Sequence, residues 1–516
     1  MFGNFVARWL GACVVFIGLI LAALRPSNGQ NPVETDTAPA RGTSPESDAD
    51  AAQAAALENR VQKVISERSS SVVAIYRHAK RSTAADKPTS LGEETALGFG
   101  SGVIIDSQGF VLTNLHVLGD WQSSSYSVWH AGKAYPAELK AGDPWLDLAV
   151  LKLPATALPA VEFGNGEGLK KGAFVVAIGN LSGVSRDGEP SSSFGVISNL
   201  HRSAPSRMLD RPVIGDAPTD EQPSDGRATL HHYGTLLQTT ANLELGSSGG
   251  LLVNLQGEMV GLTISHAALI GYERPGGFAI PVDETFLRAV EQLRSGRQPS
   301  YGFLGIAPAE VRNFTGRPDL PHGALVANVV PGTPASAAGI KVDDIVTHVD
   351  GHVIQDDVEL IRRINGKPAG ATVELTLAAS RDGAEPKEGR KVKVHLGKRP
   401  PDPLRPGFSE VTTPAWRGMK VEYATACPNF QQVSRALEGK AAVGVIEVQA
   451  NSLAWQAGLR PGDFVVLASG KACGTPEQFL QNVAAEMGPV PLTLLGNENN
   501  GGQASLQRTV GAGAAP

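Results

Sequence analysis

The residue of this chain best placed to act as a nucleophile is a serine inside a glycine cluster. It is Ser248, in the run Gly-Ser-Ser-Gly-Gly at 246–250, and an apolar strand follows at Leu251–Val253. Glycine permits the sharp turn that presents such a serine, and it lets backbone amides converge on an oxyanion. The amides of Gly246 and Ser248 are the predicted oxyanion donors. The glycine spacing favours Ser248 over the adjacent hydroxyl of Ser247.

An alcohol is a weak nucleophile at neutral pH and needs a neighbouring base. His116, in the run Thr-Asn-Leu-His-Val at 113–117, is the candidate base. Asp147 opens the run Asp-Leu-Ala-Val and would hold the imidazole tautomer. Each residue alone is equally compatible with a structural role. The three motifs in the order His, Asp, Ser, as in chymotrypsin-type triads, favour catalysis of acyl transfer.

The elements that must position these residues are short strands separated by turn residues, which predict an all-β barrel or sandwich. A first strand is expected at 72–76. Hairpins are expected around the turns 106–109 and 254–257, each ending in glycine. A short amphipathic helix near 57–66 precedes the strands, and a helix near 282–295 closes the domain. The stretch 202–230 is rich in Pro, Ser, Asp and Arg and is predicted to be a surface loop.

An internal repeat follows the strands. Gly339, Asp344 and Gly351 match three residues of the same types that lie 119 positions later, at Gly458, Asp463 and Gly470. At the same offset both copies start a helix, with Asp356 and Thr475 as N-cap candidates and Glu359 and Gln478 three residues on. A strand, an Ala-rich turn and a capped helix repeated in this way resemble the PDZ domain.

Together the three motifs and the repeat resemble the HtrA (Deg) family of serine proteases. The resemblance implies a mainly β chain: a chymotrypsin-like double β-barrel protease domain at 55–297, then two α+β PDZ domains at 300–398 and 409–510. It implies no cofactor, and a homotrimer or higher oligomer. It also implies cleavage after small aliphatic residues in unfolded polypeptides, with pocket walls that include Gly277, Phe278, Ala279 and Ile280.

PDZ domains bind peptide C-termini by strand addition, and a loop of amides captures the carboxylate. The first copy has the matching loop Phe303, Leu304, Gly305 and Ile306. The second reads Arg-Gly-Met-Lys-Val at 417–421, and we expect Lys420 to stand where glycine is usual. Asp343 also replaces a frequent glycine, and aspartate tolerates a left-handed backbone better than most residues.

Two residues depart from the family pattern beside the predicted oxyanion loop. Ser247 stands where relatives commonly carry Asn, and Thr240 stands where they often carry Asp. The three triad residues are intact, so a protease is the leading hypothesis. A catalytically inactive chaperone or peptide-binding scaffold is the alternative, and it requires these two departures to prevent formation of the oxyanion hole.

The N-terminus is predicted to be a targeting segment. The apolar run 9–24 has 16 residues and follows a single charge, Arg8. A cleaved signal peptide over 1–29 is favoured over a retained membrane anchor. Residues 30–54 carry almost no large apolar side chain and are predicted to be a disordered linker. We expect an exported protein of the periplasm or cell envelope, or, if the anchor is retained, a regulatory protease tethered to the inner membrane.

Composition excludes other classes. A net charge of −6 without long like-charged blocks argues against a nucleic-acid partner. The three cysteines have no zinc-site spacing, and Cys427 and Cys473 could either pair or be buried separately. His201, His231 and His232 lack the pattern of metal ligands, so no metal is predicted.

Overall fold

A computed structural model describes residues 45–80, 96–180, 189–203, 229–264, 277–311, 322–379, 390–496 and 505–512 of the 516-residue chain. The predicted targeting segment and most of the predicted loop at 202–230 lie outside these ranges. The chain divides into two compact units, Met1–Leu57 and Glu58–Pro516. Among the helices of the described ranges, none is long and apolar enough to cross a membrane.

The first described helix, α2 (Pro45–Arg68), is longer than predicted. The sequence placed residues 45–54 in a disordered linker and began a helix near 57, and this boundary is wrong. The error has a physical reason. Alanine has the highest helix propensity of all residues and needs no large apolar neighbour, and this stretch is rich in alanine. Most side chains of α2 between residues 49 and 60 are accordingly exposed.

The first barrel consists of six antiparallel strands, and pairing of β5 with β6 closes it. Its strands are β1 (Val72–Ala79), β2 (Gly98–Ile104), β3 (Phe110–Asn114), β4 (Ser124–His130), β5 (Lys133–Asp143) and β6 (Leu148–Lys152). The predicted hairpin at 106–109 joins β2 to β3. Gly109 there has a φ of 95°, which glycine adopts without strain. Asp106 accepts a hydrogen bond from the Gln108 amide at 2.8 Å, which fixes the turn.

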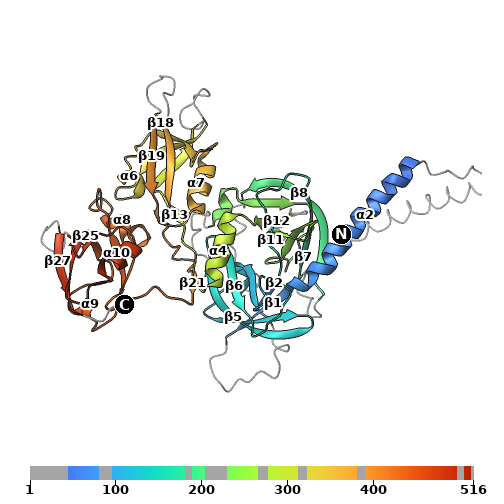
Figure 1. Ribbon diagram of the computed structural model, residues 1–516, viewed down its shortest axis with the longest axis horizontal. Coiled ribbons are helices and arrows are strands. Elements are labelled where there is room, and N and C mark those ends of the chain that lie inside the picture. The colour runs from blue at the N-terminus through green and yellow to red at the C-terminus, as the bar shows by residue number, and fades with distance from the viewer. Residues whose placement is uncertain are drawn as a thin grey trace, which may run out of the picture. The chain divides into compact units, whose positions relative to one another are not determined.

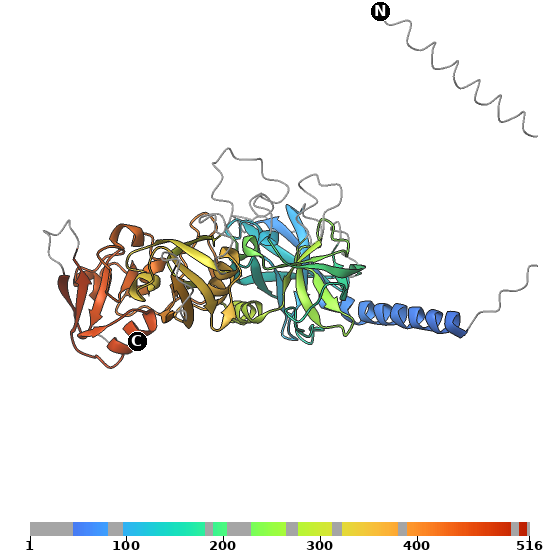
Figure 2. The same ribbon diagram turned by 90° about the horizontal axis from the view of Figure 1, so that it is seen from above.

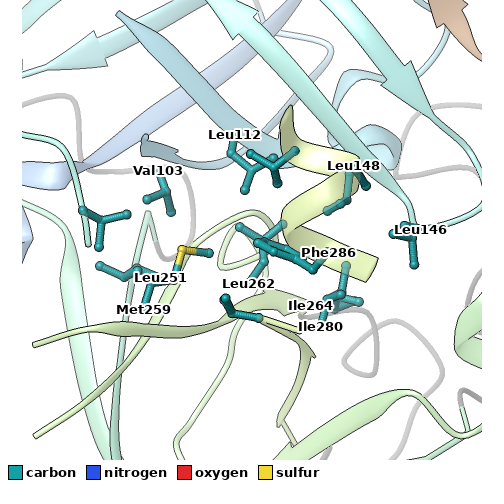
Figure 3. Packing of buried hydrophobic residues seen from close by; sticks show 14 of the residues in the cluster. Val103, Leu112, Leu146, Leu148, Leu251, Met259, Leu262, Ile264, Ile280 and Phe286 are labelled. Atoms are coloured by element: carbon teal, nitrogen blue, oxygen red, sulfur yellow. The ribbon is translucent and has the colours of Figure 1, made fainter. Parts of the chain in front are cut away.

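The second barrel is also closed and has six strands. They are β7 (Phe174–Gly179), β8 (Ser191–Arg202), β9 (Leu236–Thr239), β10 (Leu251–Asn254), β11 (Met259–Ile264) and β12 (Gly277–Pro281). Buried side chains from both barrels meet in one core, with Leu112 and Leu148 on one side and Leu262 on the other (Figure 3). Phe286 of α4 (Glu284–Arg294) packs into the same core. The barrels are therefore held together by a shared apolar interface.

Two six-stranded sheets follow, in the yellow-to-orange and the red parts of the chain (Figures 1 and 2). Five strands of each have the same order, β14-β15-β16-β18-β19 and β22-β23-β24-β26-β27, and the sixth strand, β17 or β25, pairs with β16 or β24. The first copy contains β13 (Gly302–Phe303), β14 (Ile306–Glu310), β15 (Ala324–Val329), α6 (Pro334–Ala337), β16 (Asp344–Val349), β17 (His352–Val353), α7 (Asp357–Gly366), β18 (Thr372–Ala379), β19 (Arg390–His395) and β20 (Gly397–Lys398). The second contains β22 (Met419–Tyr423), α8 (Phe430–Val433), β23 (Val443–Val448), α9 (Leu453–Gln456), β24 (Phe464–Ala468), β25 (Lys471–Ala472), α10 (Pro476–Val483), β26 (Val490–Leu495) and β27 (Ser505–Val510).

The repeated residues make repeated contacts. The Asp344 carboxylate accepts a hydrogen bond from the Lys341 amide at 2.9 Å, and Asp463 accepts from the Arg460 amide at 2.8 Å. Both predicted helix caps are confirmed: Asp356 accepts from the Glu359 amide at 2.7 Å and Thr475 from the Gln478 amide at 3.2 Å. The sequence repeat is therefore a structural repeat.

One alignment within the repeat was wrong. The glycine of the carboxylate loop in the second copy is Gly418, with a φ of 85°, and it corresponds to Gly305, with a φ of 88°. Lys420 lies two residues later, within β22, where its ammonium group forms an ion pair with Glu447 at 2.8 Å. The gap-free offset of 119 does not extend to this loop. Asp343, as expected, has a left-handed backbone with a φ of 73°.

The two cysteines of the second copy are buried free thiols. Cys473 belongs to the main core of this domain, whereas Cys427 packs in a separate cluster with Phe430 and Phe464. Burial raises the pKa of each thiol to about 12. Of the two alternatives left open by the sequence, separate burial is therefore the one found.

Candidate active site

The loop that carries Ser248 requires glycine on both sides. Gly246 has a φ of 93° and Gly249 a φ of 80°, in the region that favours glycine. A Cβ atom on Gly246 would lie 2.3 Å from the Asn180 carbonyl oxygen, and one on Gly249 would lie 2.2 Å from the Ser101 carbonyl oxygen. The glycine cluster is thus dictated by both the backbone angles and the space available.

A serine of the first barrel holds this loop. The Ser101 hydroxyl, on β2, donates to the Gly246 carbonyl at 2.7 Å and accepts from the Asn180 amide at 2.7 Å. The Ser101 amide donates to the Ser248 carbonyl at 2.8 Å. Ser248 itself is only 6% exposed. The backbone of the predicted nucleophile is therefore fixed from the opposite barrel.

His116 and Asp147 lie side by side at the ends of neighbouring strands. His116 lies in the single-turn helix α3 (Leu115–Leu118), which directly follows β3. Its Nδ1 atom lies 2.6 Å from one carboxylate oxygen of Asp147, and its amide donates to the other oxygen at 2.9 Å. Asp147 has a left-handed φ of 54°, and its carbonyl accepts hydrogen bonds from Asn114 Nδ2 and the Leu115 amide, each at 3.1 Å.

The electrostatics of this pair favour an ionised aspartate. Burial on its own would raise the pKa of Asp147, but the charge of His116 and the two hydrogen bonds from that residue outweigh burial. The pKa of Asp147 is therefore lowered from its ordinary value. The carboxylate is ionised at neutral pH and can orient the imidazole and stabilise an imidazolium.

Sequence similarity to known proteins identifies the family. Residues 100–262 match the trypsin-like peptidase domain and residues 302–392 the PDZ domain. A probable periplasmic serine endoprotease, DegP-like, of Halomonas elongata is 32% identical over 391 residues, which is 75% of this chain and 73% of that protein. The chain belongs to the HtrA family. It is a serine endopeptidase with a chymotrypsin-like protease domain and PDZ domains, as the motifs predicted.

Two further proteins are similar to this HtrA-family protease. A protein of the same description from Marinomonas sp. is 31% identical over 410 residues, 76% of this chain and 75% of its own. Among solved structures, that of the HtrA-type protease AlgW with a tripeptide is 24% identical, with a TM-score of 0.49, covering 66% of this chain and 97% of that one.

The two departures from the family pattern have local hydrogen-bonding roles. Ser247 is buried, and its hydroxyl accepts from the Glu244 amide at 3.0 Å, which closes the turn before the predicted nucleophile, Ser248. The Thr240 hydroxyl accepts from the Val196 amide at 3.0 Å and ties its segment to β8. In both cases the hydroxyl satisfies a backbone amide of the surrounding loops.

The four residues expected to form pocket walls make up most of β12. Ala279 lies in the core of the second barrel and Ile280 in the core between the barrels. Gly277 is buried against β9, opposite Thr239. Phe278 is the member of this set that is partly exposed. A direct contact of β12 with substrate would therefore involve Phe278 first.

Sequence reasoning missed two buried residues that hold the backbone leading to Asp147. Asp143 accepts from the amides of Trp145 at 3.0 Å and Leu146 at 3.3 Å, and from the hydroxyl of Tyr301. Burial raises the pKa of Asp143 to about 6. His231 lies with Nε2 2.9 Å from the Leu146 carbonyl oxygen, and burial lowers its pKa to about 4, which keeps it neutral. Only the position of Asp143, four residues before Asp147, could have drawn attention to it.

The carboxylate loop of the first PDZ domain lines a cavity of about 210 Å³. Phe303, Leu304, Gly305 and Ile306 form one side, and Leu360, Ile361 and Ile364 of α7 form the other. In the second domain Trp416 takes the place of Phe303, is 2% exposed, and packs edge-on against Phe479 of α10 with ring centroids 5.6 Å apart. A large, buried aromatic side chain thus packs against α10 at the position that Phe303 has in the first domain.

Proposed function

We propose that this chain is an exported, ATP-independent endopeptidase that degrades unfolded or misfolded proteins by an acyl-enzyme mechanism. Ser248 is the nucleophile, His116 the general base and Asp147 the residue that orients it. The observations that carry the proposal are the doubly hydrogen-bonded pair of His116 and Asp147 and the glycine loop of Ser248, which is fixed from the first barrel.

In this mechanism His116 takes the proton of Ser248 as its oxygen attacks the scissile carbonyl carbon. The amides of Gly246 and Ser248 stabilise the resulting oxyanion, and His116 then protonates the leaving amine. An acyl-Ser248 ester remains, and water activated by His116 hydrolyses it. Asp147 is ionised throughout, so it favours the imidazolium that forms in each half of the reaction.

The place of action is part of the proposal. Relatives named as periplasmic proteins, together with the apolar run 9–24, support a periplasmic or cell-envelope location. We propose a cleaved signal peptide; a retained inner-membrane anchor would instead give a tethered regulatory protease. The family resemblance supports a homotrimer or a higher oligomer.

Fluorophosphonate labelling of the full chain, followed by peptide mapping, tests the proposal. The probe reacts only with a serine activated by its base and oxyanion hole, so we expect one adduct, on Ser248. Labelling that appears only after a C-terminal peptide is added would still establish the triad. If no adduct forms with peptide and unfolded protein present, the alternative of an inactive scaffold is the better description.

We further propose that the first PDZ domain binds the C-termini of substrate polypeptides in its cavity. Ile361→Lys places a charge on the apolar wall of the groove, and we expect it to weaken binding of a C-terminal peptide by about tenfold or more. Leu480→Lys is the matched substitution in α10 of the second domain, where Trp416 packs against Phe479 of the same helix. We expect a smaller effect there. Equal losses, measured by fluorescence anisotropy, would contradict the assignment to the first domain.

A further inference from the structure

A second cavity adjoins the catalytic histidine, and one of its walls comes from outside the protease domain. The cavity has a volume of about 370 Å³. On the protease side its lining includes Leu115, His116, Trp121, Pro144 and Asp147. The remaining wall is Leu404, Arg405 and Pro406, from the segment that joins the two PDZ domains.

This connecting segment is anchored to the first barrel by main-chain pairing. Strand β21 (Phe408–Ser409) pairs antiparallel with β5, with Phe408 opposite Gly142 and Ser409 opposite Ala141 (Figure 1). The Glu410 amide then donates to the Lys140 carbonyl at 3.1 Å, and the Lys140 and Glu410 side chains form an ion pair. The segment therefore adds a seventh strand to the sheet of the first barrel. It pairs with the end of β5, directly before the turn that leads to Asp147.

An aromatic contact ties the segment to the loop that follows His116. The rings of Trp121 and Phe408 have centroids 4.8 Å apart. Asp402 stabilises the bend on the other side of the cavity wall, where one carboxylate oxygen accepts from the Leu404 amide at 2.9 Å and the other from Arg405 Nε at 3.3 Å. The pairing of β21 and the Phe408 ring thus anchor one end of residues 404–406 to the first barrel, and Asp402 fixes their bend from within the segment.

Two side chains of this wall, the apolar Leu404 and the hydrogen-bond donor Arg405, are able to contact a ligand. Leu404 is 69% exposed, so its side chain is accessible to a ligand at the cavity that it lines. Leu115, Trp121, Pro144 and Pro406 form the apolar part of the lining, which also includes the polar residues Asp120 and Thr229. Within the described part of the chain, Arg405 Nη2 is buried without a hydrogen-bond partner. An apolar surface and a cationic donor suit a side chain and a backbone carbonyl of one extended peptide.

We infer that the segment Asp402–Phe408 is a specificity element of the protease: together with Trp121 and Pro144 it binds an apolar side chain of the substrate close to the cleaved bond. The inference rests on the proposed function, because only the presence of His116 in the lining makes the occupant a substrate polypeptide. The connector between the PDZ domains thereby becomes part of the peptide-binding surface.

The test is a cleavage-site profile. The full chain digests a mixture of unfolded proteins, and mass spectrometry records the residues around each cut. The proposed site binds the side chain at one substrate position within three residues of the cleaved bond. For Leu404→Ser we expect the share of cuts with Leu, Ile, Val or Phe at that position to fall by about fivefold or more. The reason is that apolar burial is lost there. Leu404→Trp narrows the cavity and should shift that same position toward small residues. Leu287→Ser removes an exposed leucine from α4 and should leave the profile unchanged.

An unchanged profile in both Leu404 variants would overturn the inference, and so would equal changes in Leu287→Ser. If Leu404→Ser does not fold, the profile of Leu404→Trp decides. Fluorophosphonate labelling of the wild-type protein distinguishes failure of this inference from failure of the proposed function. An adduct on Ser248 with unchanged profiles would remove this inference alone, whereas a wild-type protein that is never labelled would remove the proposed function and this inference with it.

Discussion

Replacing Ser248 by alanine is expected to reduce degradation of an unfolded protein such as casein by a factor on the order of 10⁵ to 10⁶, as loss of the nucleophile does in serine proteases. The substitution removes one oxygen atom. The loop itself is held through the carbonyls of Gly246 and Ser248, which the substitution leaves in place. The variant should therefore fold, bind substrate and lack both proteolysis and fluorophosphonate labelling.

Ser247→Ala is the matched control, because it removes a hydroxyl one position away. It deletes the hydrogen bond that the Ser247 hydroxyl accepts from the Glu244 amide. A single such bond contributes about 1 kcal/mol, so we expect the rate to fall by about tenfold or less. Labelling should remain on Ser248. An inactive Ser247→Ala beside an active Ser248→Ala would show that the nucleophile had been assigned to the wrong serine.

The second large effect is expected for Asp147→Asn, with a fall in kcat on the order of 10⁴. The two hydrogen bonds of the carboxylate explain why. One oxygen accepts from the His116 amide, so in the variant the oxygen of Asn must keep that position. Its NH₂ group then faces His116 Nδ1 and donates to it. In the variant, the neutral imidazole therefore carries its proton on Nε2. This is the atom that must accept the proton of Ser248 in the proposed mechanism.

Steady-state proteolysis of the full-chain variant measures this effect. Asp106→Asn is the control, since it removes the charge that pairs with Arg294, 3.1 Å away, while the oxygen of Asn can still accept from the Gln108 amide in the turn. That variant should keep its activity within about twofold, since exposed pairs contribute little. A small loss in Asp147→Asn, comparable to that of the control, would mean that Asp147 does not set the tautomer of His116.

Much of the site could be predicted because its determinants are local. The glycines beside Ser248 are needed for backbone angles that other residues avoid, so the short motif identifies both the turn and the nucleophile candidate. The hairpin at 106–109 and the helix caps at Asp356 and Thr475 are likewise specified within a few residues. The helical stretch 45–54 is also specified locally, by the helix propensity of its alanines. A prediction based on large apolar side chains does not detect it.

The contacts that could not be predicted join residues far apart in the chain. Tyr301 reaches the buried carboxylate of Asp143, and β21 pairs with β5, across separations of more than a hundred residues. Neither Phe408–Ser409 nor Tyr301 has a local pattern that specifies its partner. Such contacts depend on how folded domains pack against each other. The periodicity of a single sequence does not indicate this packing. The cavity wall at 404–406 was invisible for this reason.

The position of Ser101 has a consequence for biosynthesis. Its hydroxyl and amide belong to the N-terminal barrel, yet they fix the loop of the C-terminal barrel that carries Ser248. A chain that has emerged only as far as its first barrel lacks Ser248, the proposed nucleophile, and a second barrel that has not yet docked has no Ser101 to order its loop. Under the proposed mechanism, the site is therefore complete only when both barrels are folded and joined.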